Sequence, residues 1–232
     1  LSLKLATNTI SYFTPLGRLG GEPFRAYILK KQYNIRLSKG LASVIIEKLL
    51  EVTWAFIFIT YALFYLLIKS TISKSIIFTF IIPCIIFIIL LYFFYSKTMK
   101  NEGFMTSVIK FFRIDKIKFV KKAGGGIERI ERDINQFFKE KRRLVPASVL
   151  SILEVLVYLI EFKVVLYFMG LNVGWMSVLI IFSFVVISTM SPIPGSLGAY
   201  EGMSILAFLS LGLGADKALL FSIIIRIVEL SM

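Results

Sequence analysis

The sequence predicts an all-α membrane protein, a polytopic transmembrane helical bundle with two pseudo-repeated broken or re-entrant helical elements. Three observations support this prediction. Of the 232 residues 57% are hydrophobic, which exceeds the apolar share of ordinary soluble domains, and the mean hydropathy is +0.83. Long apolar stretches alternate with strongly basic ones. Two stretches that contain Pro and Gly interrupt this pattern at corresponding places.

The composition excludes several classes of site. The chain has no His and a single cysteine, Cys84, which excludes His-ligated zinc, Ser-His-Asp triads and Cys-based metal sites. No ATP-binding motif is present, and we expect no cofactor. The net charge is +13, and such an excess orients a membrane protein and attracts anionic lipids. We therefore expect membrane lipids with anionic or phosphate head groups as partners, and no nucleic acid.

The first clear span follows a basic segment. Residues 1–16 could end an earlier span, and residues 17–39 carry six basic side chains against one acid, which predicts a cytoplasmic segment. Residues 40–68 form the span itself, and they exceed the roughly 20 residues that a bilayer requires. Residues 69–75 are then predicted to lie outside.

Charged residues stand in the first turns of that span. Glu47, Lys48 and Glu51 lie within five residues, and Lys48 and Glu51, three apart, can pair on a helix. One interpretation assigns them to a binding site, and the other is a solvated helix start below the membrane.

A long basic segment separates the second and third spans. Residues 76–95 form the second span, which Pro83 should kink. Residues 96–145 follow, with 14 Lys and Arg against 6 Asp and Glu, and are predicted to be cytoplasmic. Two amphipathic pieces, separated by the flexible link Gly124–Gly126, could lie on anionic lipid or dock a soluble partner. Their apolar positions are Phe104, Val108, Phe111 and Phe112, then Ile127, Ile130, Ile134, Phe137 and Phe138.

The third span, residues 146–169, begins at a proline and contains two acids. Glu154 and Glu161 are seven residues apart, on one helix face, and should point into the bundle because a carboxylate in hydrocarbon is costly. A turn at residues 170–174 is predicted outside, and residues 175–190 return inward.

Residues 188–204 cannot be helical throughout. Pro192 and Pro194 each lack a backbone donor, and two glycines follow them. Backbone groups freed in hydrocarbon need partners from protein or from water in a cavity, which predicts a broken helix or a re-entrant hairpin. Glu201 follows the turn, and an ionisable residue at this depth suggests function.

A second copy of this pattern lies near the start of the chain. Pro15 and Glu22 are seven residues apart, as are Pro194 and Glu201, with glycines between them. Corresponding interruptions in two halves indicate the binding site in repeat-built transporters. The alternative is two ordinary loops at the membrane surface.

The last spans are short or incomplete. Residues 202–213 are apolar but too short to cross a bilayer, which favours a hairpin that enters and leaves from one side. Residues 218–232 begin the last span, in which Arg226 and Glu229 could form a buried pair. Apolar sequence stops abruptly at the chain ends, so residues 1–232 are interpreted as one integral membrane domain truncated at both ends.

These pieces together resemble the lysylphosphatidylglycerol synthase transmembrane-region family of flippase-like membrane domains. The matching elements are residues 15–25, residues 47–51, residues 192–201 and Arg226. The family pattern there reads Gly-x-x-Glu/x-x-Arg, Glu-Arg-x-x-Asp and Pro-x-Pro-Gly-Gly/Ser-x-Gly-x-x-Glu. This chain has Lys48 where Arg is usual and Glu51 where Asp is usual, which keeps the charges but loses the planar fork at position 48.

The resemblance implies a multi-pass lipid translocase of the cell membrane that moves a polar-headed phospholipid or a lipid-linked precursor, with a separate lipid-modifying synthase as a further partner. Arg18 and Arg25 are the phosphate candidates, and Glu22 and Glu201 would hold them or contact a cationic head group. The predicted substrate-binding residues are Arg18, Glu22, Arg25, Glu47, Lys48, Glu51, Pro194, Gly195, Gly198, Glu201 and Arg226.

Two other classes of function stay open. One is a structural membrane domain that anchors a lipid-synthesis partner. The other is an intramembrane lipid transferase, although the chain offers carboxylates without His, a Cys nucleophile or an Asp-rich metal motif. We expect a transporter rather than an enzyme.

Overall fold

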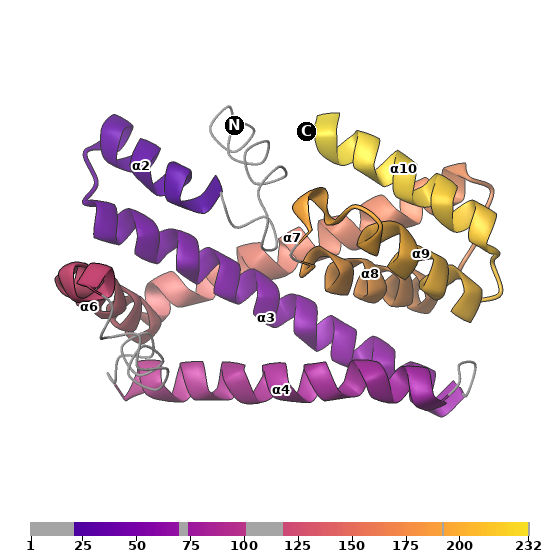
Figure 1. Ribbon diagram of the computed structural model, residues 1–232, viewed down its shortest axis with the longest axis horizontal. Coiled ribbons are helices and arrows are strands. Elements are labelled where there is room, and N and C mark those ends of the chain that lie inside the picture. Colours follow the sequence, from indigo (N-terminus) through magenta and orange to yellow (C-terminus); the bar gives the residue numbers. More distant parts are fainter. Residues whose placement is uncertain (1–20, 70–73, 101–117, 192, 232) are drawn as a thin grey trace.

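The computed structural model describes residues 21–69, 74–100, 118–191 and 193–231 (Figure 1). Every regular element in these ranges is helical, which confirms the all-α class. Three features of the sequence analysis lie outside the described residues: Pro15 of the first Pro/Gly interruption, the phosphate candidate Arg18, and the first amphipathic piece. The elements are α2 (Gly21–Tyr33), α3 (Leu37–Lys69), α4 (Lys74–Met99), α6 (Lys118–Lys139), α7 (Lys141–Phe168), α8 (Trp175–Thr189), the 3₁₀ turn η2 (Pro194–Ser196), α9 (Ala199–Ser210) and α10 (Ala215–Ser231).

The longest helix, α3, contacts α2, α4, α6, α7 and α8. Its 33 residues correspond to about 50 Å of helix at 1.5 Å per residue. The stretch Leu37–Leu66 is the one helix of the described chain that is long and apolar enough to cross a membrane, and Ile85–Thr98 and Trp175–Thr189 are shorter apolar helices. The predicted span 40–68 therefore coincides with α3 to within three residues.

Aromatic and hydroxyl contacts join α3 to α4. The rings of Phe56 and Phe87 stack with centroids 3.7 Å apart, and Thr53 Oγ1 lies 2.9 Å from the hydroxyl oxygen of Tyr95. The two helices run in opposite directions along the long axis of the molecule (Figure 1). The predicted second span is helical from Lys74 to Met99, without interruption at residue 83.

Helix α6 corrects the prediction of a flexible Gly link. The helix runs from Lys118 to Lys139 and includes Gly124–Gly126. Its apolar side packs against the adjoining ends of α3, α4 and α7, where Ile134 is buried and Phe138 contacts Phe94 edge-on. Glycine is unfavourable in a helix by about 1 kcal/mol per residue, and this tertiary packing overrides that preference.

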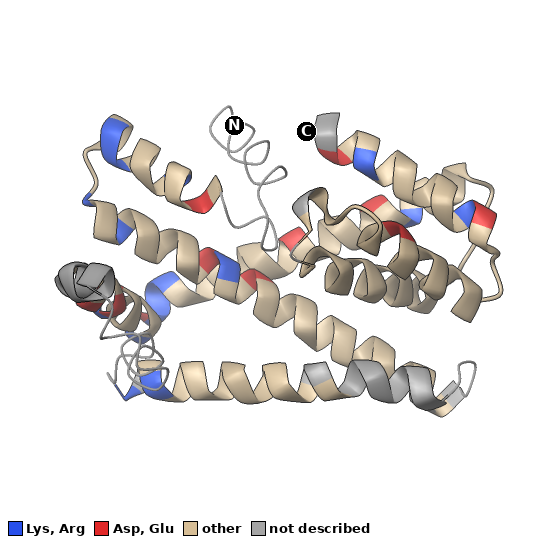
Figure 2. Cartoon of the chain, in the orientation of Figure 1, with Lys and Arg blue, Asp and Glu red and all other residues tan. Residues whose placement is uncertain are grey.

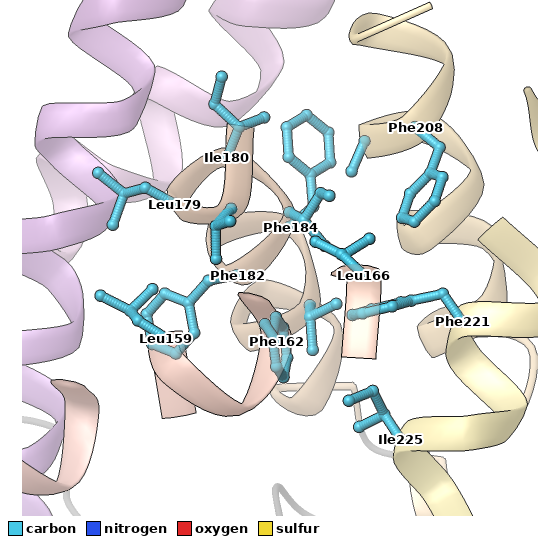
Figure 3. Close-up of a cluster of buried hydrophobic side chains, with 14 of the residues drawn as sticks. Leu159, Phe162, Leu166, Leu179, Ile180, Phe182, Phe184, Phe208, Phe221 and Ile225 are labelled. Atoms are coloured by element: carbon cyan, nitrogen blue, oxygen red, sulfur yellow. The ribbon is translucent and has the colours of Figure 1, made fainter. Parts of the chain in front are cut away.

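The C-terminal helices form the main hydrophobic core around α8 (Figure 3). Nine of the 15 residues of α8 are buried, which is the pattern of a helix enclosed on all sides. Phe162 of α7 contacts Phe182 of α8 and Phe221 of α10, with ring centroids 6.0 and 5.2 Å apart. This packing fixes α7, α9 and α10 relative to α8.

The ends of α7 differ slightly from the predicted span. The helix begins at Lys141, so Pro146 lies inside it rather than at its start. At its other end, Lys163 Nζ donates a hydrogen bond to the carbonyl oxygen of Val173 and lies over the ring of Trp175. The predicted turn between α7 and α8 is present, with Gly170 at φ +76°.

Candidate functional site

A first group of charged residues forms where α2 folds back on α3. Asn34, at φ +52°, stands in the turn between the two helices, and a left-handed conformation suits Asn better than most residues. The helices approach closely because Gly40 faces Ala26, where an added Cβ would lie 3.2 Å from the carbonyl oxygen of Ala26. The first turns of α2 therefore lie beside the middle of α3.

Three charge contacts form here, of which two join α2 to α3 and one lies within α3. Arg25 Nη1 lies 2.8 Å from Glu47 Oε2, and Lys48 Nζ lies 2.6 Å from Glu51 Oε2. Lys48 Nζ is 3.9 Å from Glu22 Oε1. The structure thus brings together five of the residues that the sequence predicted, and it confirms the Lys48–Glu51 pair.

The acids in this region outnumber the bases. Glu154 of α7 adds a negative charge that acts on both Arg25 and Lys48. Burial raises the pKa of the Glu22 carboxyl, and Lys48 and Arg25 oppose that shift. The second oxygen of Glu22 is buried without a hydrogen-bond partner among the described residues. We call this group the N-terminal charge cluster: Glu22, Arg25, Glu47, Lys48, Glu51 and Glu154.

A second group forms at the break between α8 and α9. The backbone leaves α8 at Thr189, passes through η2 and enters α9 at Ala199. Gly195 and Gly198 have φ values of +60° and +77°, which glycine adopts without strain. Ser196, between them, also has a positive φ, +51°. Glu201 Oε2 accepts a hydrogen bond of 2.8 Å from the N–H of Gly198 at the N-cap of α9. The predicted broken backbone is therefore present.

One arginine of α10 closes this break. Arg226 Nε lies 2.8 Å from Glu201 Oε1. Its Nη1 and Nη2 donate to the carbonyl oxygens of Gly195 and Ser196 at 2.9 and 3.3 Å, and the guanidinium lies over the ring of Tyr200. The planar fork thus satisfies carbonyls that the broken helix leaves free. We call this group the Arg226 site: Gly195, Ser196, Gly198, Tyr200, Glu201 and Arg226.

The structure corrects the predicted pairing of charges. Glu22 and Glu201 were expected to hold Arg18 and Arg25 or to contact a cationic head group. Arg18 lies outside the described residues, while Arg25 forms its ion pair with Glu47 and Glu201 forms its ion pair with Arg226. The sequence left open a pair between Arg226 and Glu229 on the same helix, and the ion pair that the structure describes for Arg226 joins α10 to α9.

Sequence reasoning left some residues out of the predicted site. Glu154, Ser196 and Tyr200 were not included, although a carboxylate in an apolar helix already marked Glu154 as unusual. Tyr200 carried no comparable signal, because an aromatic residue in an apolar helix is ordinary core. Pro194 takes part through the backbone of η2.

The chemistry of both groups is that of charge recognition. Nowhere in the described chain do three His, Cys, Asp or Glu side chains come together as a metal ion would require. The bases are Arg and Lys, which bind phosphate and carboxylate groups. The two groups thus combine anion-binding side chains with carboxylates.

Comparisons with known proteins assign the family. The sequence model of the lysylphosphatidylglycerol synthase TM region matches residues 1–232. A UPF0104 membrane protein of Methanothermobacter thermautotrophicus is 24% identical over 239 residues, which covers 99% of this chain and 70% of the relative. No solved structure matches. Because the family match extends over the whole sequence, the chain belongs to the lysylphosphatidylglycerol synthase TM region family of membrane proteins.

Proposed function

We propose that this protein is a lipid translocase that moves a polar-headed phospholipid, or a lipid-linked precursor, between the leaflets of the cell membrane. The observation that carries the proposal is the pair of charged groups at helix starts and breaks within apolar helices. Charged side chains at membrane depth are costly, and they are typical of pathways for polar substrates. Broken helices at such positions are typical of transporter binding sites.

The exposed surface supports a polytopic arrangement. α4 has 26 residues and α7 has 28, which give roughly 39 and 42 Å at 1.5 Å per residue and exceed a hydrocarbon core of about 30 Å. The side chains that these helices expose include Ile85, Ile89, Val157 and Ile160. Exposed apolar surface of this kind is unusual on soluble proteins, and lipid contact explains it.

The lengths of α8 and α9 support a re-entrant hairpin. With 15 and 12 residues they reach roughly 22 and 18 Å, less than a bilayer requires. We propose that the hairpin enters from the outer face and that its turn, which contains η2, lies within the membrane. Figure 2 shows blue residues gathered near the α2–α3 turn, α6 and the start of α7. We therefore propose that residues 17–39 and 96–145 face the cytoplasm.

Arg25 is the phosphate-binding candidate that the geometry favours. Its one ion pair uses Nη1, so the other guanidinium nitrogens have no partner among the described residues. Arg226, in contrast, directs Nε to a carboxylate and both terminal nitrogens to carbonyls. A lipid phosphate could therefore bind Arg25 without first breaking the fold.

A liposome assay tests the proposal. Purified protein is reconstituted with a fluorescent phospholipid, and an impermeant reductant reports how much label reaches the outer leaflet. We expect lipid movement by the wild type and by Arg143→Ala, whose exposed ion pair with Glu140 belongs to neither group, and none by Arg25→Ala. Modified lipid products would indicate a transferase instead. Neither movement nor product from folded wild-type protein would indicate a structural domain that anchors a lipid-synthesis partner.

A further inference from the structure

Two helix pairs in this protein share one plan. α2 has 13 residues and α9 has 12, and each packs against the helix that follows it, α3 or α10. Each pair is joined by a short turn that contains a residue at positive φ: Asn34 in the first turn, and Gly212 and Gly214 in the second. Both short helices carry an acid in the first turn, Glu22 or Glu201.

The two pairs are oriented in opposite directions. The α2–α3 turn lies at the left end of the long axis and the α9–α10 turn at the right end (Figure 1). Each short helix therefore begins toward the middle of the molecule and runs outward. Related units of opposite orientation are the architecture of many secondary transporters, which place the substrate where the units meet.

The charges of the two pairs correspond in position and in contact. Lys48 follows Glu22 by 26 residues, and Arg226 follows Glu201 by 25. In each pair the base on the second helix faces the acid that begins the first, at 3.9 Å for Lys48 and Glu22 and at 2.8 Å for Arg226 and Glu201. The same acid–base relation is thus built twice, from residues far apart in the sequence.

Further acids extend the correspondence. An acid follows each base by three residues, Glu51 after Lys48 and Glu229 after Arg226. α7, which runs past both pairs, adds one acid to each. Glu154 acts on Lys48, and Glu161, seven residues further on, is an electrostatic neighbour of Glu229. A helix start attracts one acid because of its dipole, but that preference does not account for four matching positions.

We propose that α2–α3 and α9–α10 are inverted repeat units, and that Lys48 and Arg226 are equivalent positioning residues that close the two faces of the translocation site. Each base holds the acidic start of its short helix against the following helix, Lys48 on the cytoplasmic face and Arg226 on the outer face. The direction of closure rests on the proposed function.

The contacts differ in a way that this assignment explains. The outer unit is closed, because Arg226 holds both Glu201 and the carbonyls of the break. The cytoplasmic unit is looser at Lys48, which lies nearer to Glu51 than to Glu22, and the partly exposed Arg25–Glu47 pair joins its two helices. Opposite states of two equivalent gates are what alternating access requires.

Exchanging the two bases tests the assignment without a change in net charge. The double variant Lys48→Arg, Arg226→Lys gives the planar fork to the cytoplasmic unit and the point charge to the outer unit. Single reporter cysteines are introduced at the exposed positions Phe24 and Leu197 in a Cys84→Ser background. An impermeant maleimide is then applied separately to each face of sealed vesicles.

In the exchanged protein we expect labelling of residue 24 from the cytoplasmic face to fall, and labelling of residue 197 from the outer face to rise, each on the order of tenfold. Unchanged labelling at both positions, or a change in the same direction at both, would overturn the assignment. The single variants Lys48→Arg and Arg226→Lys should each change one face only, and they replace the double variant if it does not fold.

This readout is independent of lipid transport. Loss of lipid movement in the wild-type assay would reject the proposed function and leave the labelling result intact. Normal lipid movement by the wild type, together with labelling that the exchange leaves unchanged or changes in the same direction at both positions, would reject the repeat assignment alone.

Discussion

The N-terminal charge cluster and the Arg226 site contain the same kinds of side chain and use them differently. The Arg226 side chain is 11% exposed, forms an ion pair with Glu201, and donates two hydrogen bonds to backbone carbonyl oxygens. Arg25 is 25% exposed and its partner Glu47 is 33% exposed, with one contact between them. The first arrangement stabilises a broken backbone, and the second leaves the Arg25 side chain partly exposed. An arginine near a helix break is therefore not by itself a substrate site.

The choice of base follows from what each one must hold. At the Arg226 site two carbonyls and a carboxylate surround one side chain, and a planar fork with five donors matches that set. Lys48 faces only carboxylates, Glu51 at 2.6 Å and Glu22 at 3.9 Å, and a flexible ammonium serves such a site. The departure from the family pattern at position 48 therefore fits the local geometry.

Arg226→Ala should lower the stability of the protein most, because it removes the contacts that distinguish the Arg226 site from the N-terminal charge cluster. It leaves Glu201 without its ion pair and the carbonyls of Gly195 and Ser196 without donors. Removing one partner of a largely buried pair typically costs about 3–5 kcal/mol. Thermal unfolding in detergent measures the loss, and Arg226→Lys should be intermediate. A melting temperature equal to that of the wild type would show that the break does not depend on this residue.

Gly198→Ala should have the next largest effect. Its φ of +77° lies in a region that costs a residue with a side chain about 1–2 kcal/mol. Gly126→Ala is the matched control, because that glycine is inside α6 with open space around it, and a helical Gly→Ala change stabilises by about 0.5–1 kcal/mol. The denaturant concentration at the midpoint of unfolding should therefore fall for Gly198→Ala and rise for Gly126→Ala.

Arg25→Ala should separate stability from function. Because the Arg25–Glu47 pair is partly exposed, its loss should lower the free energy of unfolding by about 1 kcal/mol or less. Lipid movement in liposomes should nevertheless stop, and Arg25→Lys should also be impaired because it lacks the fork. Full lipid transport by a correctly inserted Arg25→Ala protein would exclude Arg25 from the site.

Arg143→Ala provides the smallest expected change. Arg143 is 68% exposed, and its ion-pair partner Glu140 is three residues earlier in the chain, at the N-cap of α7. Pairs of this kind contribute about 0.2–1 kcal/mol, and high salt screens them. The melting temperature should change little and lipid movement should remain normal. A large loss here would indicate that the Arg25→Ala result also reflects general destabilisation.

Much of the helical order could be predicted from the sequence. The predicted span 40–68 lies within α3, because an uninterrupted apolar run leaves few alternatives to a helix. The break after residue 188 also followed from composition, since two prolines cannot donate and the glycines provide the positive φ values. Such features depend on residues that are neighbours in the chain, so local chemistry determines them.

The tertiary structure decided which charges meet. Arg25 contacts Glu47 across the α2–α3 turn, and Arg226 contacts Glu201 across the α9–α10 turn. These pairings depend on where two helices cross. Hydrophobic periodicity shows which face of a helix is buried, but it does not show which other helix packs against that face. The continuous α6 has the same origin, because packing against α3, α4 and α7 outweighs the preference of three glycines for a break. Composition thus determined the apolar helices and the charged residues available, and three-dimensional packing determined which of those charges are largely buried against other elements and which remain partly exposed.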